Sequence, residues 1–119
     1  MLNTNLAIKT TTVNGYHNGR SGGFFFYKSG HVVYCTFTGI LSASSASAPN
    51  QITDSSGGTA IIPEDYRPIR EVNVAVNPVS NNTVNNTARF KYLSNGQIQF
   101  LAEGTSSFEY SHAISWIAN

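Results

Sequence analysis

The side chains that could bind a ligand fall into three short clusters and one isolated tryptophan. Each cluster combines an aromatic ring or an amide with a charged group, a mixture that orients polar ligands such as saccharides in a site. Trp116 lies in an alternating terminal segment, so its indole either packs in the core or a subunit interface, or forms a platform for a sugar ring. The candidate ligand-binding residues are Tyr16, His17 and Arg20 in the first cluster, Asp54 (beside Asn50 and Gln51) in the second, Asp65, Tyr66 and Arg67 in the third, and Trp116.

Catalysis requires reactive groups that converge, and the sequence suggests few. We find no serine nucleophile elbow, no H-E-x-x-H zinc pair and no glycine-rich phosphate loop. The histidines His17, His31 and His112 lack the spacing of metal ligands, although a zinc site assembled in space from all three stays open. A glycosidase needs two carboxylates roughly 5–10 Å apart, whereas Glu64 and Asp65 are neighbours on a predicted turn and are expected to diverge. We therefore predict a binding protein and not an enzyme, with no catalytic residues, metal ligands or cofactor.

The composition is that of one small domain without a strongly charged partner. The chain has 119 residues and a formal net charge of +1, so we expect a single domain over residues 1–119 and no nucleic-acid binding. No apolar run approaches the length of a membrane-spanning helix, so no membrane insertion is expected. The first residues lack the basic and apolar regions of a signal peptide. Cys35, the single cysteine, lies in a predicted strand and is expected to be a buried, unreactive thiol.

Short alternating apolar runs separated by Gly, Asn and Ser predict an all-β fold. Two hairpins are the clearest elements, because in each a short glycine-containing turn joins two β-rich runs. Polar loops are expected at 14–23, 42–59 and 78–86, and the first is expected to be irregular because it contains several glycines. We predict an antiparallel β-sandwich or barrel, jelly-roll-like, with about six to eight strands and no long helix. The predicted strands cover residues 6–13, 24–27, 31–40, 69–77, 87–93, 97–101 and 109–117.

A proline-bracketed corner at 61–71 is the most polar part of the chain. Pro63 and Pro68 each have a fixed φ and favour an extended conformation for the preceding residue. The corner therefore leads the chain into the strand at 69–77, where alternating valines face the core. Its charged side chains form either a solvated turn with local ion pairs or a loop that contacts a ligand.

Three segments carry a resemblance to a known family. They are Lys-Ser-Gly-His-Val-Val at 28–33, Ile-Pro-Glu-Asp-Tyr-Arg-Pro at 62–68, and the hairpin from Ala-Arg-Phe at 88–90 to Asn-Gly-Gln-Ile at 95–98. Their order resembles the C-terminal head domain of bacteriophage receptor-binding proteins, which form the tips of tail fibres and baseplates. The resemblance implies a β-sandwich or barrel head that forms a homotrimer and binds a host cell-surface saccharide without cleaving it.

The same resemblance implies a location and further partners. The protein would lie at the tail tip of a virion, after production in the host cytoplasm, and would join other tail or baseplate proteins through an N-terminal region missing from this chain. The strand at 24–27 gives the trimer independent support, because it is aromatic on both faces and needs cover on both.

Three other functions are open at this point. The chain could be a structural virion or appendage protein, a glycan-degrading tail enzyme, or a cellular ligand of C1q- or TNF-like build. A receptor-binding head is expected to gather some of the loops 14–23, 42–59 and 63–68 at one exposed end or at a subunit cleft. A structural protein is expected to bury them in contacts, and an enzyme to hold paired carboxylates in a groove.

Overall fold

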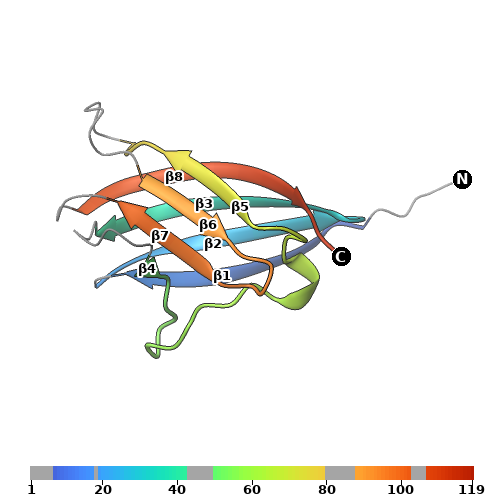
Figure 1. Ribbon diagram of the computed structural model, residues 1–119, viewed down its shortest axis with the longest axis horizontal. Helices are drawn as coiled ribbons and strands as arrows, with labels where there is room; N and C mark the ends of the chain where they lie inside the picture. The colour runs from blue at the N-terminus through green and yellow to red at the C-terminus, as the bar shows by residue number, and fades with distance from the viewer. Residues whose placement is uncertain (1–6, 18, 43–49, 80–87, 103–106) are drawn as a thin grey trace, which may run out of the picture.

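The computed structural model describes residues 7–17, 19–42, 50–79, 88–102 and 107–119. In this part of the chain eight strands and one short 3₁₀ turn are present, so the predicted all-β class is confirmed. Figure 1 shows the strands as two layers. The elements are β1 (Lys9–His17), β2 (Arg20–Ser29), β3 (Val32–Ser42), β4 (Asn50–Gln51), η1 (Glu64–Tyr66), β5 (Val72–Val76), β6 (Ala88–Tyr92), β7 (Ile98–Ala102) and β8 (Ser107–Ile117).

The strands form two open antiparallel sheets that do not close into a barrel. We call the sheet with the order β1-β2-β3-β8 the long sheet, and the sheet with the order β4-β7-β6-β5 the short sheet. The pairs β3–β8, β4–β7 and β5–β6 are nested along the chain, and β1 and β2 extend the long sheet as a meander. β1 is therefore an edge strand of the long sheet.

The core lies between the sheets and is built mainly from aromatic rings. Phe24 and Phe37 of the long sheet contact each other with ring centroids 4.5 Å apart. Phe90 of the short sheet meets Phe37 at 5.0 Å and its neighbour Phe100 at 5.1 Å. All four rings are completely buried, and burial of each contributes about 1.5–3 kcal/mol to stability.

Three glycines of the long sheet allow close packing, two of them against these rings and Gly39 against the backbone of β2. Gly15, Gly22 and Gly39 lie side by side across β1, β2 and β3. A Cβ atom at Gly22 would lie 2.5 Å from the Phe37 ring, and one at Gly15 would lie 2.6 Å from Ile52. The predicted irregular loop at 14–23 is therefore wrong: its glycines allow close packing within β1 and β2. The connection between these strands is short and contains Gly19, with φ of 79°.

The predicted hairpins are confirmed. β2 and β3 are joined through Gly30 with φ of 60°, and β6 and β7 through Gly96 with φ of 94°. Both glycines adopt the left-handed conformation that tight turns require. The first predicted strand begins later than expected, at Lys9, and runs on to His17.

The proline corner has the predicted geometry. Pro63 precedes η1 with φ of −55°, and Arg67 is extended before Pro68, with φ of −73° and ψ of 141°. β5 follows, with Val76 buried and the other two alternating valines packed against the core. Parts of the predicted loops 42–59 and 78–86 lie outside the described residues, at 43–49 and 80–86.

Candidate functional site

An open pocket lies beside the edge strand β1. Its volume is about 450 Å³, and its two sides are β1 and the segment 54–63, which follows β4 and runs below β1 in Figure 1. Hydroxyl, amide and carboxylate groups line it together with small apolar side chains, and the described lining residues include no aromatic ring. They are Thr12, Val13, Asn14, Asp54, Ser55, Thr59, Ala60, Ile61 and Pro63.

The free edge of β1 adds main-chain donors and acceptors to this pocket. Tyr16 exchanges two hydrogen bonds with Thr53, from Tyr16 N to Thr53 O at 2.8 Å and from Thr53 N to Tyr16 O at 3.0 Å. Because every second residue of an antiparallel strand points its main-chain groups to the same side, those of Asn14 and Thr12 also point away from β2. Among the described residues they have no main-chain partner on that side.

Asp54 is the ionisable group of the pocket, and its orientation is fixed by its own turn. Oδ1 accepts hydrogen bonds from Ser56 N at 2.9 Å, Ser56 Oγ at 2.7 Å and Gly58 N at 2.9 Å. The hydroxyl of Ser56, followed by the main-chain donors of the turn, lowers the pKa of the Asp54 carboxyl. The Asp54 carboxylate is therefore negatively charged at neutral pH, and the hydrogen bonds of its turn fix its orientation in the pocket.

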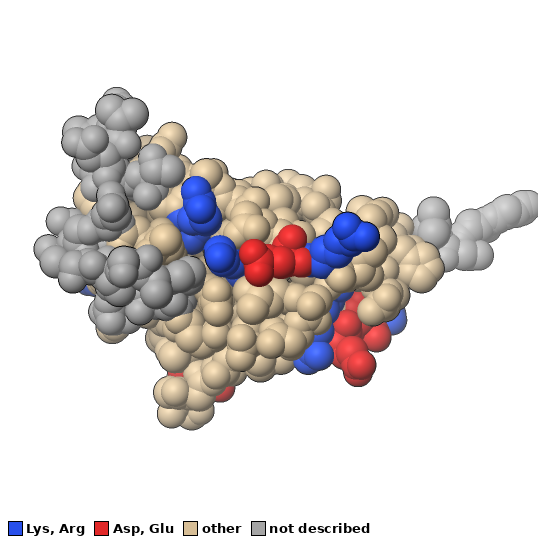
Figure 2. Space-filling model, in the orientation of Figure 1, with Lys and Arg blue, Asp and Glu red and all other residues tan. Residues whose placement is uncertain are grey.

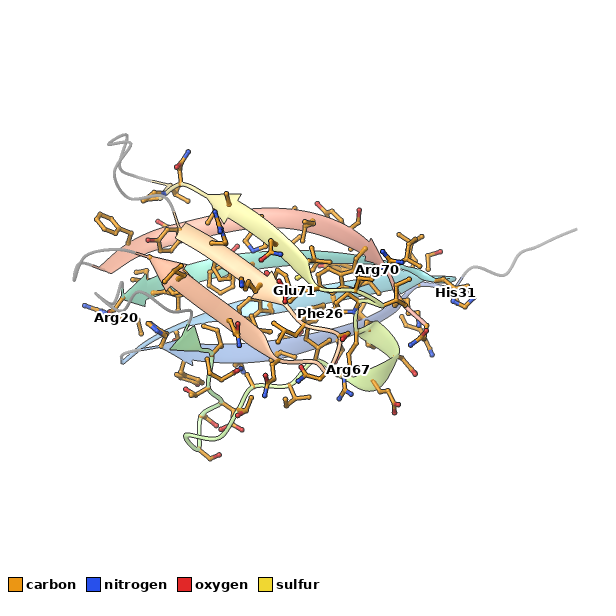
Figure 3. All side chains as sticks on the ribbon, in the orientation of Figure 1. Arg20, Phe26, His31, Arg67, Arg70 and Glu71 are labelled. Carbon is orange, nitrogen blue, oxygen red and sulfur yellow. The ribbon has the colours of Figure 1, made fainter. Side chains whose placement is uncertain are left out.

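The first predicted cluster is divided between two faces of β1. Tyr16 is partly buried and pairs through its backbone with the Asp54 turn. The side chain of His17 points to the opposite face, where it is buried against Phe100, with ring centroids 5.3 Å apart. His17 Nδ1 lies 2.8 Å from Ser42 O, and burial lowers its pKa. Arg20 is exposed at the end of the sandwich opposite His31, as Figure 3 shows.

The third cluster, Asp65, Tyr66 and Arg67, lies toward the end of the sandwich away from Arg20. Its side chains stabilise the proline corner. Asp65 is exposed and lies 3.7 Å from Lys9 Nζ. Tyr66 is buried in the core. Arg67 Nε donates to Ile62 O at 2.7 Å. Figure 3 shows Arg67 and Arg20 well apart along the long axis of the sandwich, so the structure does not bring the three predicted clusters together.

Trp116 belongs to the core in this structure. Its side chain is 6% exposed, and Nε1 donates to Tyr66 O at 2.8 Å. The ring lies 5.0 Å from Tyr92. Of the two interpretations left open for Trp116, the structure therefore supports packing, and the indole has no free face to form a sugar platform.

The structure also shows the surroundings of three other kinds of reactive group: a serine in a hydrolase-like pattern, the cysteine, and possible metal ligands. Residues 19–23 do spell G-x-S-x-G, so the pattern is present in the sequence after all. Ser21 lies at the start of β2 and not in the strand-to-helix turn of a hydrolase, so it forms no nucleophile elbow. Cys35 is buried as predicted, and burial raises its pKa to about 12. Within the described ranges, no three His, Cys, Asp or Glu side chains gather where a metal ion could bind, and no helix is long and apolar enough to cross a membrane.

Most of the pocket wall is not among the residues predicted from the sequence to bind a ligand. Thr12 lies in a predicted strand that suggests no binding role, and Thr59, Ile61 and Pro63 lie in predicted connections. A signal was present in the alternation of Thr10, Thr12 and Asn14, which places a polar row on one face of β1. The partner segment 54–63 could not be assigned to this strand, because their contact joins distant parts of the chain.

No protein-family model matches the chain, and a search of curated proteins found no match.

Proposed function

We propose that this chain is the head domain of a bacteriophage receptor-binding protein, which attaches to a host cell-surface saccharide without cleaving it. The observation that carries the proposal is the pocket beside β1. Sugar hydroxyls both donate and accept hydrogen bonds, and the pocket offers both kinds of partner through Thr12, Asn14 and the free edge of β1. The apolar side chains of Ile61 and Pro63 provide a surface for the C–H groups of a sugar ring.

The charge of the pocket narrows the class of saccharide. Asp54 is the single ionisable side chain among the described lining residues, and its lowered pKa keeps it negative at neutral pH. A carboxylate accepts hydrogen bonds from neutral hydroxyls and from ammonium groups but repels anionic sugars. We therefore propose a neutral or amino-sugar ligand, and exclude polyanions such as teichoic acids from this pocket.

The remaining parts of the proposal follow the resemblance described above. The head would have a jelly-roll-like fold, would form a homotrimer at the tail tip of the virion, and would join other tail or baseplate proteins through an N-terminal region. A closed trimer would carry several equal pockets, and this would multiply a weak affinity for a repeating polysaccharide by avidity. The nested strand pairs of the sandwich support the fold assignment.

The proposal is tested by binding to neutral, amino and anionic oligosaccharides on a glycan array, followed by calorimetric titration with the best neutral or amino oligosaccharide. Asp54→Asn keeps an oxygen for the turn and removes the charge, and Asn14→Ala removes an amide from the opposite wall. We expect either change to raise the dissociation constant by about tenfold, the effect of losing one good hydrogen bond. Asn73→Ala is the matched control, because Asn73 is exposed on the short sheet and does not line the pocket.

Three results would contradict the proposal. They are a failure to bind any saccharide on the array or any bacterial surface, an equal effect of the control variant, and release of new reducing ends from the bound saccharide. The first would favour a structural virion protein, a second candidate supported by the apolar and nearly uncharged outer face of the long sheet. The third would favour a glycan-degrading enzyme.

A further inference from the structure

The outer face of the long sheet is the most apolar exposed surface among the described residues. Tyr27 of β2 lies beside Tyr34 of β3, with ring centroids 6.2 Å apart, and their side chains are 42% and 47% exposed. Val32 lies beside Ile117 at one end of the same face, with 49% and 52% exposure. Phe25 extends the patch toward β1 and is 40% exposed. Aromatic and branched side chains at these exposures form a contiguous patch and not scattered single residues.

Charge is nearly absent from this outer face. Glu109, near the start of β8, is the one acidic or basic side chain among its described strand positions; the others are hydroxyl, amide, small or apolar. The short sheet is different: Arg89 and Lys91 point outward from β6, and Lys91 Nζ lies 3.9 Å from Glu71. Figure 2 shows the resulting stripe of charged groups across that sheet. The two outer faces of the sandwich therefore differ in charge.

The outer face has the size of a protein interface. Four strands about 4.8 Å apart and roughly ten residues long span an area of about 600 Å². Specific complexes bury about 600–1,000 Å² on each partner, so this face reaches the lower end of that range, and crystal-type contacts bury less. Interface centres are enriched in Tyr and Phe and depleted in charged residues, most of all where identical subunits meet.

We propose that the outer face of the long sheet packs against a second copy of this chain, with Phe25, Tyr27 and Tyr34 at the centre of the contact. This names the surface by which the proposed homotrimer would assemble. Thr12 and Asn14, two of the pocket residues, lie on β1 at the rim of the same face, beside Phe25 and Gly23. The proposed contact is therefore centred on β2 and β3 and leaves the edge of β1 open. The short sheet, with its charged stripe, then stays exposed to solvent.

The first test measures the mass of the protein in solution by light scattering after size-exclusion chromatography, over concentrations from micromolar to hundreds of micromolar. We expect the wild-type chain to form a defined oligomer. Tyr34→Lys places a charge in the centre of the face and is expected to weaken association at least tenfold. Ile69→Lys is the matched control, because Ile69 is an equally exposed apolar residue, at 52%, outside the sheet, and it is expected to leave the mass unchanged. Circular dichroism and the unfolding midpoint confirm that both variants fold.

The second test shows which face is covered. Thr36 lies on β3 between Phe25 and Ala113, and Thr36→Cys introduces a thiol there for labelling with a maleimide. The native Cys35 is fully buried and does not compete. In the oligomer the new thiol is expected to react at least tenfold more slowly than in the Tyr34→Lys background.

A monomeric wild-type chain at the highest concentration would overturn this inference. So would an oligomer in which the thiol at position 36 reacts at the monomer rate, since assembly would then use another surface. Asp54→Asn separates this inference from the proposal of saccharide binding. The variant is expected to weaken saccharide binding without changing the mass of the oligomer, so either proposal can fail while the other stands.

Discussion

Acid should destabilise this protein through a histidine held inside the sandwich. His112 is on the inner face of β8, where Nε2 lies 2.7 Å from Tyr92 Oη. Its ring centroid is 4.8 Å from that of Phe90 and 6.2 Å from that of Phe37. Nδ1 is buried and has no hydrogen-bond partner among the described residues. Burial among these rings lowers the pKa of His112 to about 4, from an ordinary value of 6.5.

The direction in which pH changes stability follows from comparing proton binding to His112 in the folded and the unfolded chain. Between pH 6.5 and pH 4 the unfolded chain binds a proton on His112 and the folded chain does not, so the free energy of unfolding falls as the pH falls. Below pH 4 both states are protonated and this contribution is constant. The pKa difference corresponds to at most roughly 3 kcal/mol. Because the imidazole is partly exposed, we expect a loss of about 1–2 kcal/mol between pH 7 and pH 5.

The assay is urea denaturation followed by circular dichroism at pH 7, 6 and 5. His112→Gln keeps a polar group near Tyr92 but does not titrate, so it should remove most of the pH dependence. The remainder belongs to His17, whose pKa is also lowered by burial. His31→Gln, which changes an exposed residue, should keep the wild-type dependence. A wild-type chain that is equally stable at pH 7 and pH 5, or an unchanged dependence in His112→Gln, would refute the reasoning.

Two further predictions concern stability, measured by denaturation with urea at pH 7. Gly22→Ala should cost about 1–3 kcal/mol, because its Cβ would lie 2.5 Å from the Phe37 ring; a neutral effect would show that the glycine row is not tightly packed. Lys28→Met should cost about 1–3 kcal/mol, because buried Lys28 Nζ donates to the main-chain oxygens of Asp65, at 2.5 Å, and Asn119, at 2.6 Å. Lys9→Met, which removes only an exposed ion pair, should change stability by less than about 1 kcal/mol, and an equal loss in both variants would refute the role of Lys28.

Local signals predicted the parts of the fold that depend on few residues. Gly30 and Gly96 each follow a β-rich run, and a left-handed residue at such a position almost forces a hairpin. Pro63 and Pro68 define the corner for the same local reason. Gly15 and Gly22 lie in strands and not in the predicted loop, because a glycine in the sequence can serve either a turn or a close contact. Only the packing partner distinguishes these uses, and Phe37 and Ile52 are distant in sequence from the glycines that they touch.

The candidate site was less predictable than the fold because it combines distant segments. Asp54, a predicted ligand-binding residue, lines the pocket, since a turn rich in Ser and Gly presents it to solvent. Thr12 and Pro63, which face each other across the pocket's two sides, share no local signal. His17 and Trp116 carry functional groups typical of binding sites, but here their polar atoms make hydrogen bonds to main-chain oxygens inside the protein.

The polar corner shows why charge in the sequence did not mark the recognition surface. Lys28, Arg67 and Trp116 all donate hydrogen bonds to main-chain oxygens of residues 62–66. A 3₁₀ turn between two prolines leaves such oxygens without ladder partners, and buried carbonyls require donors. The cationic and indole groups are therefore needed to close the corner over the core. The surfaces that keep unpaired polar or apolar groups are elsewhere, along the edge of β1 and on the outer face of the long sheet, and both proposals are built on these two surfaces.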